Sequence, residues 1–279
     1  MSYILVTIVR NEITNIGNLI KSVKNQSLKP KFWLIFDDQS NDGTKEILLN
    51  LNAEWITVEE AKEYAERSLL NYSNILSQCF EIIEKLVSSK NISWEYIAVV
   101  DGDVILENKY FDHLTQYLKK HKNVGIVSGK LIDSTFNKEI YQRNELPWGA
   151  ANLYRKECLK DIGGFASAPS HNSVENVLAN IKGWKTKILS TTKFFHQRDM
   201  GAKKGYFAGY HAMGGAAKWL GITLTYALTK SIYLTFKIHP AAGIGYLVGF
   251  SEASEKKCDN KSVTNFYREK AIFSNIFRK

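Results

Sequence analysis

The sequence has few of the residues that mark small secreted proteins and disordered chains. Only three of its 279 residues are cysteine and four are proline. Cys79, Cys158 and Cys258 lie far apart and form no C-x-x-C pair, which argues against a disulfide framework and favours a reducing compartment. The scarcity of proline, together with an apolar fraction of 44%, argues against large-scale disorder. We therefore expect a globular protein of the cytoplasm.

Long apolar runs are also lacking. No stretch of about 18 consecutive apolar residues occurs, so a membrane-spanning helix is not expected. The first nine residues lack the basic leader of a secretory signal, and none is expected. Lys230 and Pro240 interrupt the apolar, aromatic segments between Trp219 and Phe250. Aromatic residues flanked by lysines favour a helix lying on an anionic membrane, at the cytoplasmic face. A homo-oligomer interface or a lid over a binding site is the open alternative.

Acidic residues are scarce in the last third of the chain. Residues 1–181 contain 20 Lys/Arg and 23 Asp/Glu, whereas residues 182–279 contain 17 and 5. The net charge of +9 therefore arises entirely in the C-terminal third. Such asymmetry indicates contact with an anionic surface, or else a solvated basic face. Because no nucleic-acid-binding module is recognisable, we expect no nucleic acid as a partner.

The chain does contain a regular alternation of short apolar runs and amphipathic segments. Runs rich in β-branched and aromatic residues predict strands, and apolar spacings of three and four predict helices. Strands are predicted at 4–9, 32–36, 55–57, 96–100, 124–128 and 187–189, with a strand or loop at 148–154. Helices are predicted at 13–23, 47–51, 72–87, 110–118, 155–162 and 174–181, and a capping-box spacing at 57–60 predicts one more. This order predicts an α/β fold with a mainly parallel sheet.

Two carboxylates follow the most apolar of the predicted strands. Asp101 and Asp103 come directly after residues 96–100, with Gly102 between them. In open α/β sheets, ligands bind outside the carboxyl ends of the strands. Two aspartates at that edge can hold a hard divalent cation, which neutralises a diphosphate, and a glycine permits close approach. A strand that ends in a polar turn is the simpler explanation of the same residues.

Polar motifs recur after the other predicted strands, in a characteristic order. They are Arg10-Asn11-Glu12, the loop from Asp37 to Thr44, Asp101-Gly102-Asp103, and Gly149 to Lys156 running on to Gly163-Gly164-Phe165. Over roughly residues 1–200 this set resembles the family 2 glycosyltransferases, which have the GT-A fold. The resemblance implies a Rossmann-like mixed, mainly parallel sheet flanked by helices in residues 1–205, followed by a helical C-terminal extension in residues 206–279. It also implies an inverting sugar transfer from a nucleoside diphosphate sugar to a glycan or lipid-linked acceptor, with Mn²⁺ or Mg²⁺.

The resemblance assigns residues to the donor and to the metal. Asp38, supported by Asp37, would accept hydrogen bonds from a uracil or guanine base, with uridine favoured. Arg10 would stack on the base or reach a phosphate. The other residues expected on the donor side are Thr7, Val9, Glu12, Asp101, Gly102 and Arg198. The expected metal ligands are Asp103, Asp101 and His196.

The catalytic base is where this sequence departs from the family pattern. The family usually supplies the base from a Glu-Asp pair at the start of the helix after the Gly-Gly-Phe loop, and residues 170–176 contain no such pair. We favour Glu175 as the base because it is the carboxylate of this stretch. His171 is the second candidate, since its ordinary pKa suits proton transfer. Trp148, Gly149 and Ala150 are expected on the acceptor side.

Two other functions remain open at this point. A chain that lacks the base would be a nucleotide-sugar-binding protein of the same fold with little or no turnover. A nucleotidyltransferase uses a related sheet, but the loop rich in glycine and arginine expected after its first strand is replaced here by Arg10-Asn11-Glu12.

Overall fold

The computed structural model describes residues 2–61, 70–89, 91–133, 138–139, 145–147, 149–197, 205–253 and 258–270. Trp148 and Arg198, which we expected on the acceptor and donor sides, lie outside these residues. The chain forms two compact units. An α/β unit comprises Met1–Ser167 and His171–Gln197, and a helical unit comprises Ala168–Ser170 and Arg198–Lys279.

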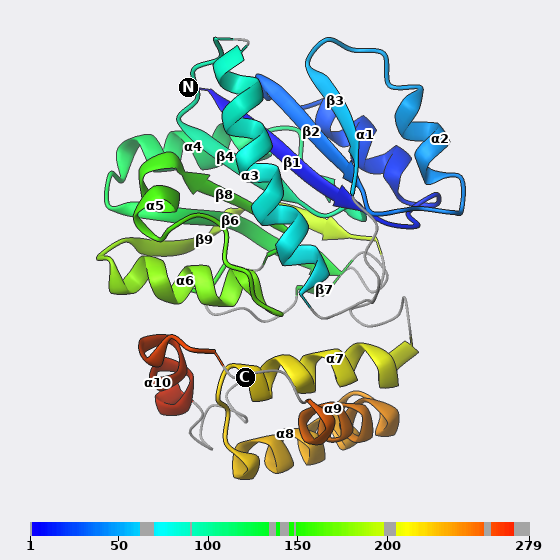
Figure 1. The fold of residues 1–279 in the computed structure, drawn as a ribbon, viewed down its shortest axis with the longest axis vertical. Helices are drawn as coiled ribbons and strands as arrows, with labels where there is room; N and C mark the ends of the chain where they lie inside the picture. Colours follow the sequence, from blue (N-terminus) through cyan, green and yellow to red (C-terminus); the bar gives the residue numbers. More distant parts are fainter. Residues whose placement is uncertain are drawn as a thin grey trace. The chain divides into compact units, whose positions relative to one another are not determined.

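The α/β unit is built on one mixed sheet (Figure 1). Its strands are β1 (Tyr3–Val9), β2 (Phe32–Asp37), β3 (Ile56–Glu60), β4 (Tyr96–Val100), β5 (Val104–Leu106), β6 (Val124–Asp133), β7 (Lys138–Glu139), β8 (Ala151–Arg155) and β9 (Lys185–His196). They lie in the order β3-β2-β1-β4-β8-β6-β9-β5, with β7 paired to β6. Strands β3, β2, β1 and β4 are parallel, as are β6 and β9, whereas β8 runs antiparallel to both of its neighbours. The predicted α/β fold with a mixed sheet between helices is confirmed.

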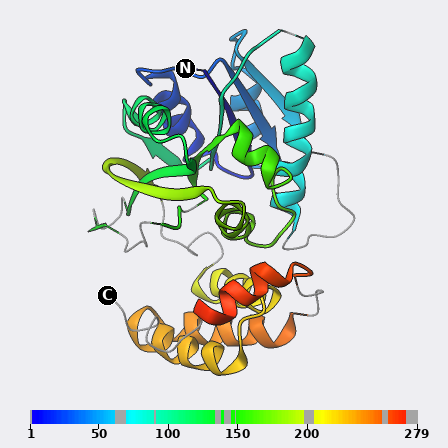
Figure 2. The same cartoon turned by 90° about the vertical axis from the view of Figure 1, so that its left-hand side faces the viewer.

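Alternation along the central strand explains the two layers of helices. All seven residues of β1 are buried, and successive side chains of a strand point to opposite faces. Leu5 packs in the core shared with α1 (Ile16–Lys24) and α4 (Tyr110–Lys120). Ile4 packs in the core shared with α3 (Asn71–Ser89) and α5 (Lys156–Asp161). In the turned view of Figure 2, α3 (cyan) and α4 (blue-green) accordingly lie on opposite sides of the sheet.

Two predicted helices differ from the structure. Residues 57–60 belong to β3, where Thr57 pairs with Leu34 and Val58 with Ile35 of the buried strand β2. Pairing with a neighbouring strand thus decides the conformation of residues 57–60, and the capping-box spacing does not begin a helix within them. The helix expected from residue 174 begins earlier, since α6 spans His171–Ile181. The remaining helix of this unit is α2 (Thr44–Leu49).

The helical unit contains α7 (Gly205–Trp219), α8 (Leu224–Lys237), α9 (Pro240–Glu252) and α10 (Lys261–Lys270). Glycines let α7 and α9 pack with their backbones in contact. A Cβ atom added to Gly214 would lie 2.0 Å from the carbonyl oxygen of Tyr246, and one on Gly249 would lie 2.0 Å from that of His211. None of the helices that the structure describes combines the length and the apolar character needed to cross a membrane.

Candidate functional site

The carboxyl ends of β1, β2 and β4 meet at one edge of the sheet, as expected for neighbouring parallel strands. The backbone N–H of Asp38, just after β2, donates to the carbonyl of Val9 at 2.8 Å. The N–H of Asp101, just after β4, donates to the carbonyl of Ala150 at 3.0 Å. Backbone hydrogen bonds therefore hold the loops after these strands in place, and with them the polar side chains that they carry.

A cluster of three potential metal ligands lies at this edge. One ligand atom each of Asp101, Asp103 and His196 lies within 4.8 Å of the others. The pairing of β5 with β9 sets Val104 opposite His196. The imidazole therefore lies next to Asp103, the residue before Val104. Nε2 of His196 accordingly lies 3.4 Å from Oδ1 of Asp103. Two carboxylates and an imidazole are a donor set that suits Mn²⁺, and the carboxylates also suit Mg²⁺. The residues present therefore fit a divalent cation.

Electrostatics in the cluster also favour a bound cation. Burial raises the pKa of Asp101, and the negative charge of Asp103 raises it further. A hydrogen bond from Tyr72 lowers the pKa, as do the positive charges that His196 and His171 carry when protonated. The net shift is upward. Two carboxylates in a poorly solvated site repel each other, so a divalent cation that enters between them relieves an unfavourable charge.

The loop after β1 packs directly against the Asp101-Gly102-Asp103 turn. A Cβ atom on Gly102 would lie 2.9 Å from Cγ1 of Val9 and 3.1 Å from Cγ of Glu12. This close approach explains the glycine between the two aspartates. Glu12 is itself held in place, because its N–H donates to Thr44 and its carboxylate accepts from Asn15.

The candidate donor residues fall into two groups. Arg10 and Asp38 form an ion pair of 3.5 Å between Nη1 and Oδ2 at the sheet edge. Asp37 instead holds its own loop, since its carboxylate accepts from both the N–H and the hydroxyl of Ser40. Thr7 lies in the core, where its hydroxyl accepts from Nε1 of Trp33 at 3.0 Å. The structure thus gives Asp37 a positioning role in the loop that carries Asp38, and it gives Thr7 a packing role that the sequence did not indicate.

The first turn of α6 brings together both candidates for the base. Nδ1 of His171 lies 3.2 Å from Oε1 of Glu175, one helical turn away. The Glu175 side chain is 0% exposed, and its carboxylate also accepts from the hydroxyl of Tyr154 at 2.7 Å and from the N–H of Ala166 at 3.1 Å. Glu175 is therefore enclosed by protein donors, whereas His171 occupies the start of the helix, the position at which we expected the Glu-Asp pair.

Charge and burial act in opposite directions on His171. Burial lowers the pKa of the imidazole, but the charge of Glu175, its hydrogen bond and the charge of Asp101 raise it. The net result is a pKa above the ordinary value of 6.5. The neighbouring carboxylate thus makes His171 a stronger base than an isolated buried imidazole.

Tyr72 connects the helix start to the metal ligands, and sequence reasoning missed it. Its hydroxyl donates to Oδ1 of Asp101 at 2.8 Å, and its ring stacks on His171 with centroids 5.3 Å apart. The apolar stripe of residues 72–87 indicated only core packing. Nothing in the sequence near Tyr72 points to Asp101, because the two meet only through the packing of α3 on the sheet.

The expected acceptor-side residues that the structure describes adjoin both parts of the site. The carbonyl of Ala150 accepts from Asp101, as noted above. A Cβ atom on Gly149 would lie 3.0 Å from Cγ of Asn172, in the first turn of α6. The segment before β8 therefore runs between the carboxylate cluster and His171.

Comparison with known proteins gives one family match. Residues 4–66 match the family described as Glycosyl transferase family 2. This region covers β1, β2 and β3 with the two helices between them. No curated protein sequence matches the chain.

Solved structures extend the likeness to the fold of most of the chain. The mannosyltransferase PcManGT from Pyrobaculum calidifontis, in complex with GDP-Man and Mn²⁺, is 15% identical with a TM-score of 0.58, over 90% of this chain and 68% of that one. S. aureus TarS 1–349 in complex with UDP is 14% identical with a TM-score of 0.54, over 90% of this chain and 71% of that one. The chain spans only 44% of another S. aureus TarS structure, at a TM-score of 0.52 and 14% identity. At these identities the likeness shows the GT-A fold.

Proposed function

We propose that this chain is a family 2 glycosyltransferase, which transfers a sugar from a nucleoside diphosphate sugar with inversion. The family match of residues 4–66 and the GT-A fold support this proposal. The meeting of Asp101, Asp103 and His196 at the carboxyl end of β4 carries this proposal. A Mn²⁺ or Mg²⁺ ion held there would supply positive charge beside the diphosphate of the donor.

The residues at the ends of β1 and β2 support a nucleotide pocket beside the cluster. The Asp38 carboxylate accepts hydrogen bonds and so suits the N–H groups of uracil or guanine. Arg10, paired with Asp38, offers a planar guanidinium for stacking or a fork for phosphate. Structural neighbours bind UDP, UDP-GlcNAc or GDP-Man. We expect a uridine diphosphate sugar as the donor, and a donor screen includes both UDP- and GDP-sugars.

The enclosed position of Glu175 changes our choice of base. A group that accepts a proton from the acceptor hydroxyl must be reachable by that hydroxyl, and three protein donors already surround Glu175. We therefore propose that His171 is the base and Glu175 the positioning residue. With Nδ1–H directed at Glu175, the lone pair of Nε2 is available for the proton. The Glu175 carboxylate then stabilises the imidazolium that forms.

The proposed reaction is a single displacement. The acceptor hydroxyl oxygen forms a bond to the anomeric carbon of the sugar, while the bond from that carbon to the diphosphate oxygen breaks. The hydroxyl proton passes to His171, and the electron pair of the broken bond leaves on the nucleoside diphosphate. Attack from the face opposite the leaving group inverts the anomeric configuration.

Donor turnover distinguishes this proposal from its two alternatives. Full-length protein is incubated with UDP- and GDP-sugars, with Mn²⁺ or with EDTA, and release of nucleoside diphosphate is measured. We expect release that requires the metal and is lost in Asp103→Asn. Tight donor binding without any release would indicate a binding protein, and production of pyrophosphate from a nucleoside triphosphate and a sugar phosphate would indicate a nucleotidyltransferase.

An exposed apolar stripe on α8 favours a membrane as an additional partner. The stripe consists of Leu224, Leu228, Ile232 and Phe236, which are 59%, 42%, 60% and 83% exposed. A spacing of four puts them on one face of the helix. The C-terminal third also carries the positive excess of the chain. We propose that this face lies on an anionic lipid surface, because apolar burial and charge attraction then act together.

Liposome sedimentation tests the membrane proposal. We expect the protein to bind vesicles containing phosphatidylserine and to bind neutral vesicles much less. Burial of one large apolar side chain contributes about 1.5–3 kcal/mol, so Ile232→Gln with Phe236→Gln should abolish binding, whereas Leu49→Gln on α2 should not. Unchanged vesicle binding by the double variant would refute the proposal. Loss of a dimer instead, measured by light scattering, would show that the stripe is a homo-oligomer interface.

A further inference from the structure

Gln197 directly follows the candidate metal ligand His196, at the point where β9 ends. Its backbone N–H donates to the carbonyl of Asp103 at 2.9 Å. The hydrogen bonding of the chain thus continues one residue beyond the strand. It is made to the residue whose Oδ1 lies 3.4 Å from Nε2 of His196. Two of the three candidate ligands therefore adjoin Gln197, one along the chain and one through a hydrogen bond.

The side chain of Gln197 connects this strand end to the start of α1. Its Oε1 accepts from Nδ2 of Asn18 at 2.6 Å, and its Nε2 donates to the carbonyl of Asn15 at 3.2 Å. The oxygen and the nitrogen of the amide thus each bond the same short segment of the chain. These partners lie 179 and 182 positions away in the sequence, so the connection exists only in the folded chain.

Asn15 continues the connection to the turn that carries the carboxylates. Its Nδ2 donates to Oε2 of Glu12 at 2.9 Å. Cγ of Glu12 in turn lies 3.1 Å from the position that a Cβ atom on Gly102 would take, and Gly102 is the residue before Asp103. Together with the bond from Gln197 to Asp103, these contacts close a ring that joins the end of β9, the start of α1 and the carboxylate turn.

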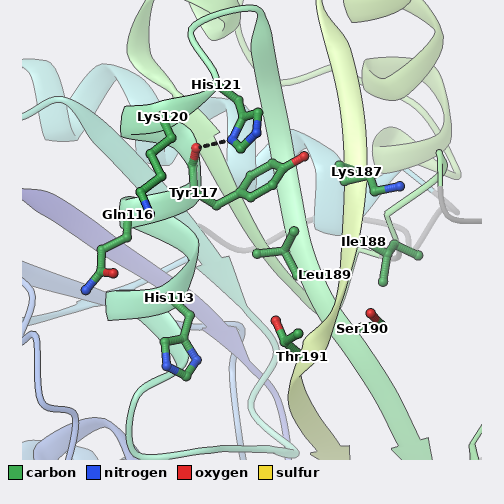
Figure 3. Close-up of a pocket in the computed structure, with 10 residues that line it drawn as sticks. All are labelled: His113, Gln116, Tyr117, Lys120, His121, Lys187, Ile188, Leu189, Ser190 and Thr191. Carbon is green, nitrogen blue, oxygen red and sulfur yellow. Dashed lines mark hydrogen bonds between the residues drawn. The ribbon is translucent and has the colours of Figure 1, made fainter.

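Farther back along β9 the strand is held less regularly. The consecutive residues Gly129 and Lys130 of β6 pair with Leu189 and Lys193, so the intervening residues of β9 bulge out of the ladder. Beside this stretch, a hollow of about 510 Å³ lies between α4 and residues 187–191 of β9 (Figure 3). Pairing and packing are thus interrupted upstream, and the position of the last residues of the strand depends more on contacts made at its end.

A metal ligand at a strand end needs such contacts for a physical reason. Chain ends of regular elements open more readily than their centres. A ligand that moves freely loses conformational entropy when it binds a metal, and this loss lowers the affinity. Residues that hold ligands in place accordingly change metal affinity by about 10- to 100-fold. The amide of Gln197 is placed to do this for His196.

We propose that Gln197 is a positioning residue, whose side chain ties the end of β9 to α1 and so holds the imidazole of His196 beside Asp103. This role rests on the proposed metal-dependent function, in which His196 is a ligand. Gln197 acts through that imidazole, because its own side-chain oxygen and nitrogen bond Asn18 and Asn15.

Mn²⁺ titration of the full-length protein, followed by electron paramagnetic resonance, tests this role. Gln197→Ala removes both side-chain bonds but keeps the N–H that donates to Asp103. Gln26→Ala is the matched control. Gln26 is buried just beyond the other end of α1, where its side chain donates to the carbonyl of Glu107 at 2.7 Å and accepts from the N–H of Phe111 at 3.3 Å.

Two further measurements separate positioning from general loss of stability. Pulsed resonance on the same samples reports the nitrogen coupling between Mn²⁺ and a ligated imidazole, which a lower folding stability does not by itself remove. Thermal unfolding in EDTA reports the stability of each variant without metal. Asn18→Ala, at an exposed position, removes one of the two bonds from the other side, and it tests the contact even where Gln197→Ala fails to fold.

We expect Gln197→Ala to bind Mn²⁺ about tenfold more weakly than the wild type, with a weaker nitrogen coupling. Gln26→Ala should match the wild type in both, although it is less stable. Asn18→Ala should show a smaller fall in the same direction. Adding Gln197→Ala to His196→Ala should lower the affinity no further, because both changes act on the same imidazole.

Wild-type affinity and nitrogen coupling in both Gln197→Ala and Asn18→Ala would overturn the positioning role and leave His196 a ligand. An equal loss in Gln26→Ala would count equally against it, since general loosening of α1 would then be the cause. Additive losses in the double variant would show that Gln197 does not act through the imidazole. If His196→Ala binds Mn²⁺ as tightly as the wild type, the ligand assignment itself fails, and the positioning role fails with it.

Discussion

Tyr72 and Asp101 are joined by a hydrogen bond of 2.8 Å from the phenol hydroxyl to Oδ1. Through this bond α3, which follows the third strand, supports a metal-ligand candidate that follows the fourth. The same phenol ring stacks on His171, the candidate base. One side chain thus contacts both a candidate metal ligand and the candidate base.

Removing the Tyr72 hydroxyl should weaken metal binding. In Tyr72→Phe the ring keeps its stacking, but Asp101 loses a donor that lowers its pKa. A hydrogen bond to a charged group contributes about 1.5–3 kcal/mol, so we expect Mn²⁺ affinity to fall about tenfold at neutral pH. The affinity is measured by Mn²⁺ titration with electron paramagnetic resonance. Tyr3→Phe, which removes a buried hydroxyl bonded to Leu28, is the control and should bind Mn²⁺ normally. Equal affinity in both variants would contradict the role given to Tyr72.

Removing the imidazole of His196 should weaken metal binding while leaving the nucleotide site intact. In His196→Ala the two aspartates remain, so Mn²⁺ still binds. Loss of a residue that only supports a metal ligand typically lowers metal affinity 10- to 100-fold, so we expect the Mn²⁺ affinity to fall by at least that much. This substitution leaves Asp38 and Arg10, the residues proposed to contact the nucleotide, unaltered, so UDP binding in EDTA should not change. Mn²⁺ titration and UDP calorimetry check the two expectations. A metal affinity equal to that of the wild type would remove His196 from the ligand set.

The two candidates for the base should respond differently to substitution. His171→Ala loses the group that accepts the proton, so we expect kcat to fall about 10²- to 10⁴-fold, with donor binding retained. In Glu175→Gln the amide oxygen can still accept from Ala166 and His171, and the amide nitrogen can donate to the hydroxyl oxygen of Tyr154, so this variant should lose less. The measurement is steady-state transfer or donor hydrolysis, together with a donor titration for each variant. A dead Glu175→Gln protein beside an active His171→Ala protein would reverse the assignment.

The pH dependence of the reaction should report the His171–Glu175 pair. His171 accepts a proton only when neutral, and its pKa is raised, so the rate should increase as pH rises through a value above 6.5. Glu175→Gln removes the charge that raises the pKa, and the inflection should move to lower pH. The folding stability that the His171–Glu175 ion pair contributes is fully present below the ordinary pKa of His171. It is lost as pH rises through the raised pKa of the folded protein. An inflection in kcat/KM that stays in place in Glu175→Gln would contradict this account.

A side chain at the α7–α9 contact should destabilise the helical unit. In Gly214→Ala the added Cβ would meet the carbonyl of Tyr246 at 2.0 Å, so the helices must separate, at a cost of about 1–3 kcal/mol for such overpacking. Gly17→Ala is the matched control, because that helical glycine has open space around its Cβ position. Urea unfolding of both variants checks the difference. A Gly214→Ala protein as stable as the control would show that the two helices do not pack this closely.

Local patterns were sufficient to predict much of the α/β unit. The buried strands β1, β2 and β4 were predicted from continuous apolar runs, since strands covered on both faces need apolar side chains at every position. The prediction that the capping-box spacing at residues 57–60 begins a helix was wrong for these four residues, because pairing of β3 with β2 decides their conformation. The start of α6 was placed too late because the residues before Val174 are polar and show no helical apolar spacing.

The sequence alone predicted most of the order of strands and helices, the carboxylates at the end of β4, and the likeness to a sugar transferase, because these depend on residues close together in the chain. Three-dimensional packing was needed for the rest. It set Tyr72 between Asp101 and His171, and it enclosed Glu175 with donors from Tyr154 and Ala166. These contacts join residues on different elements of the fold, and the local spacing of the sequence does not record them.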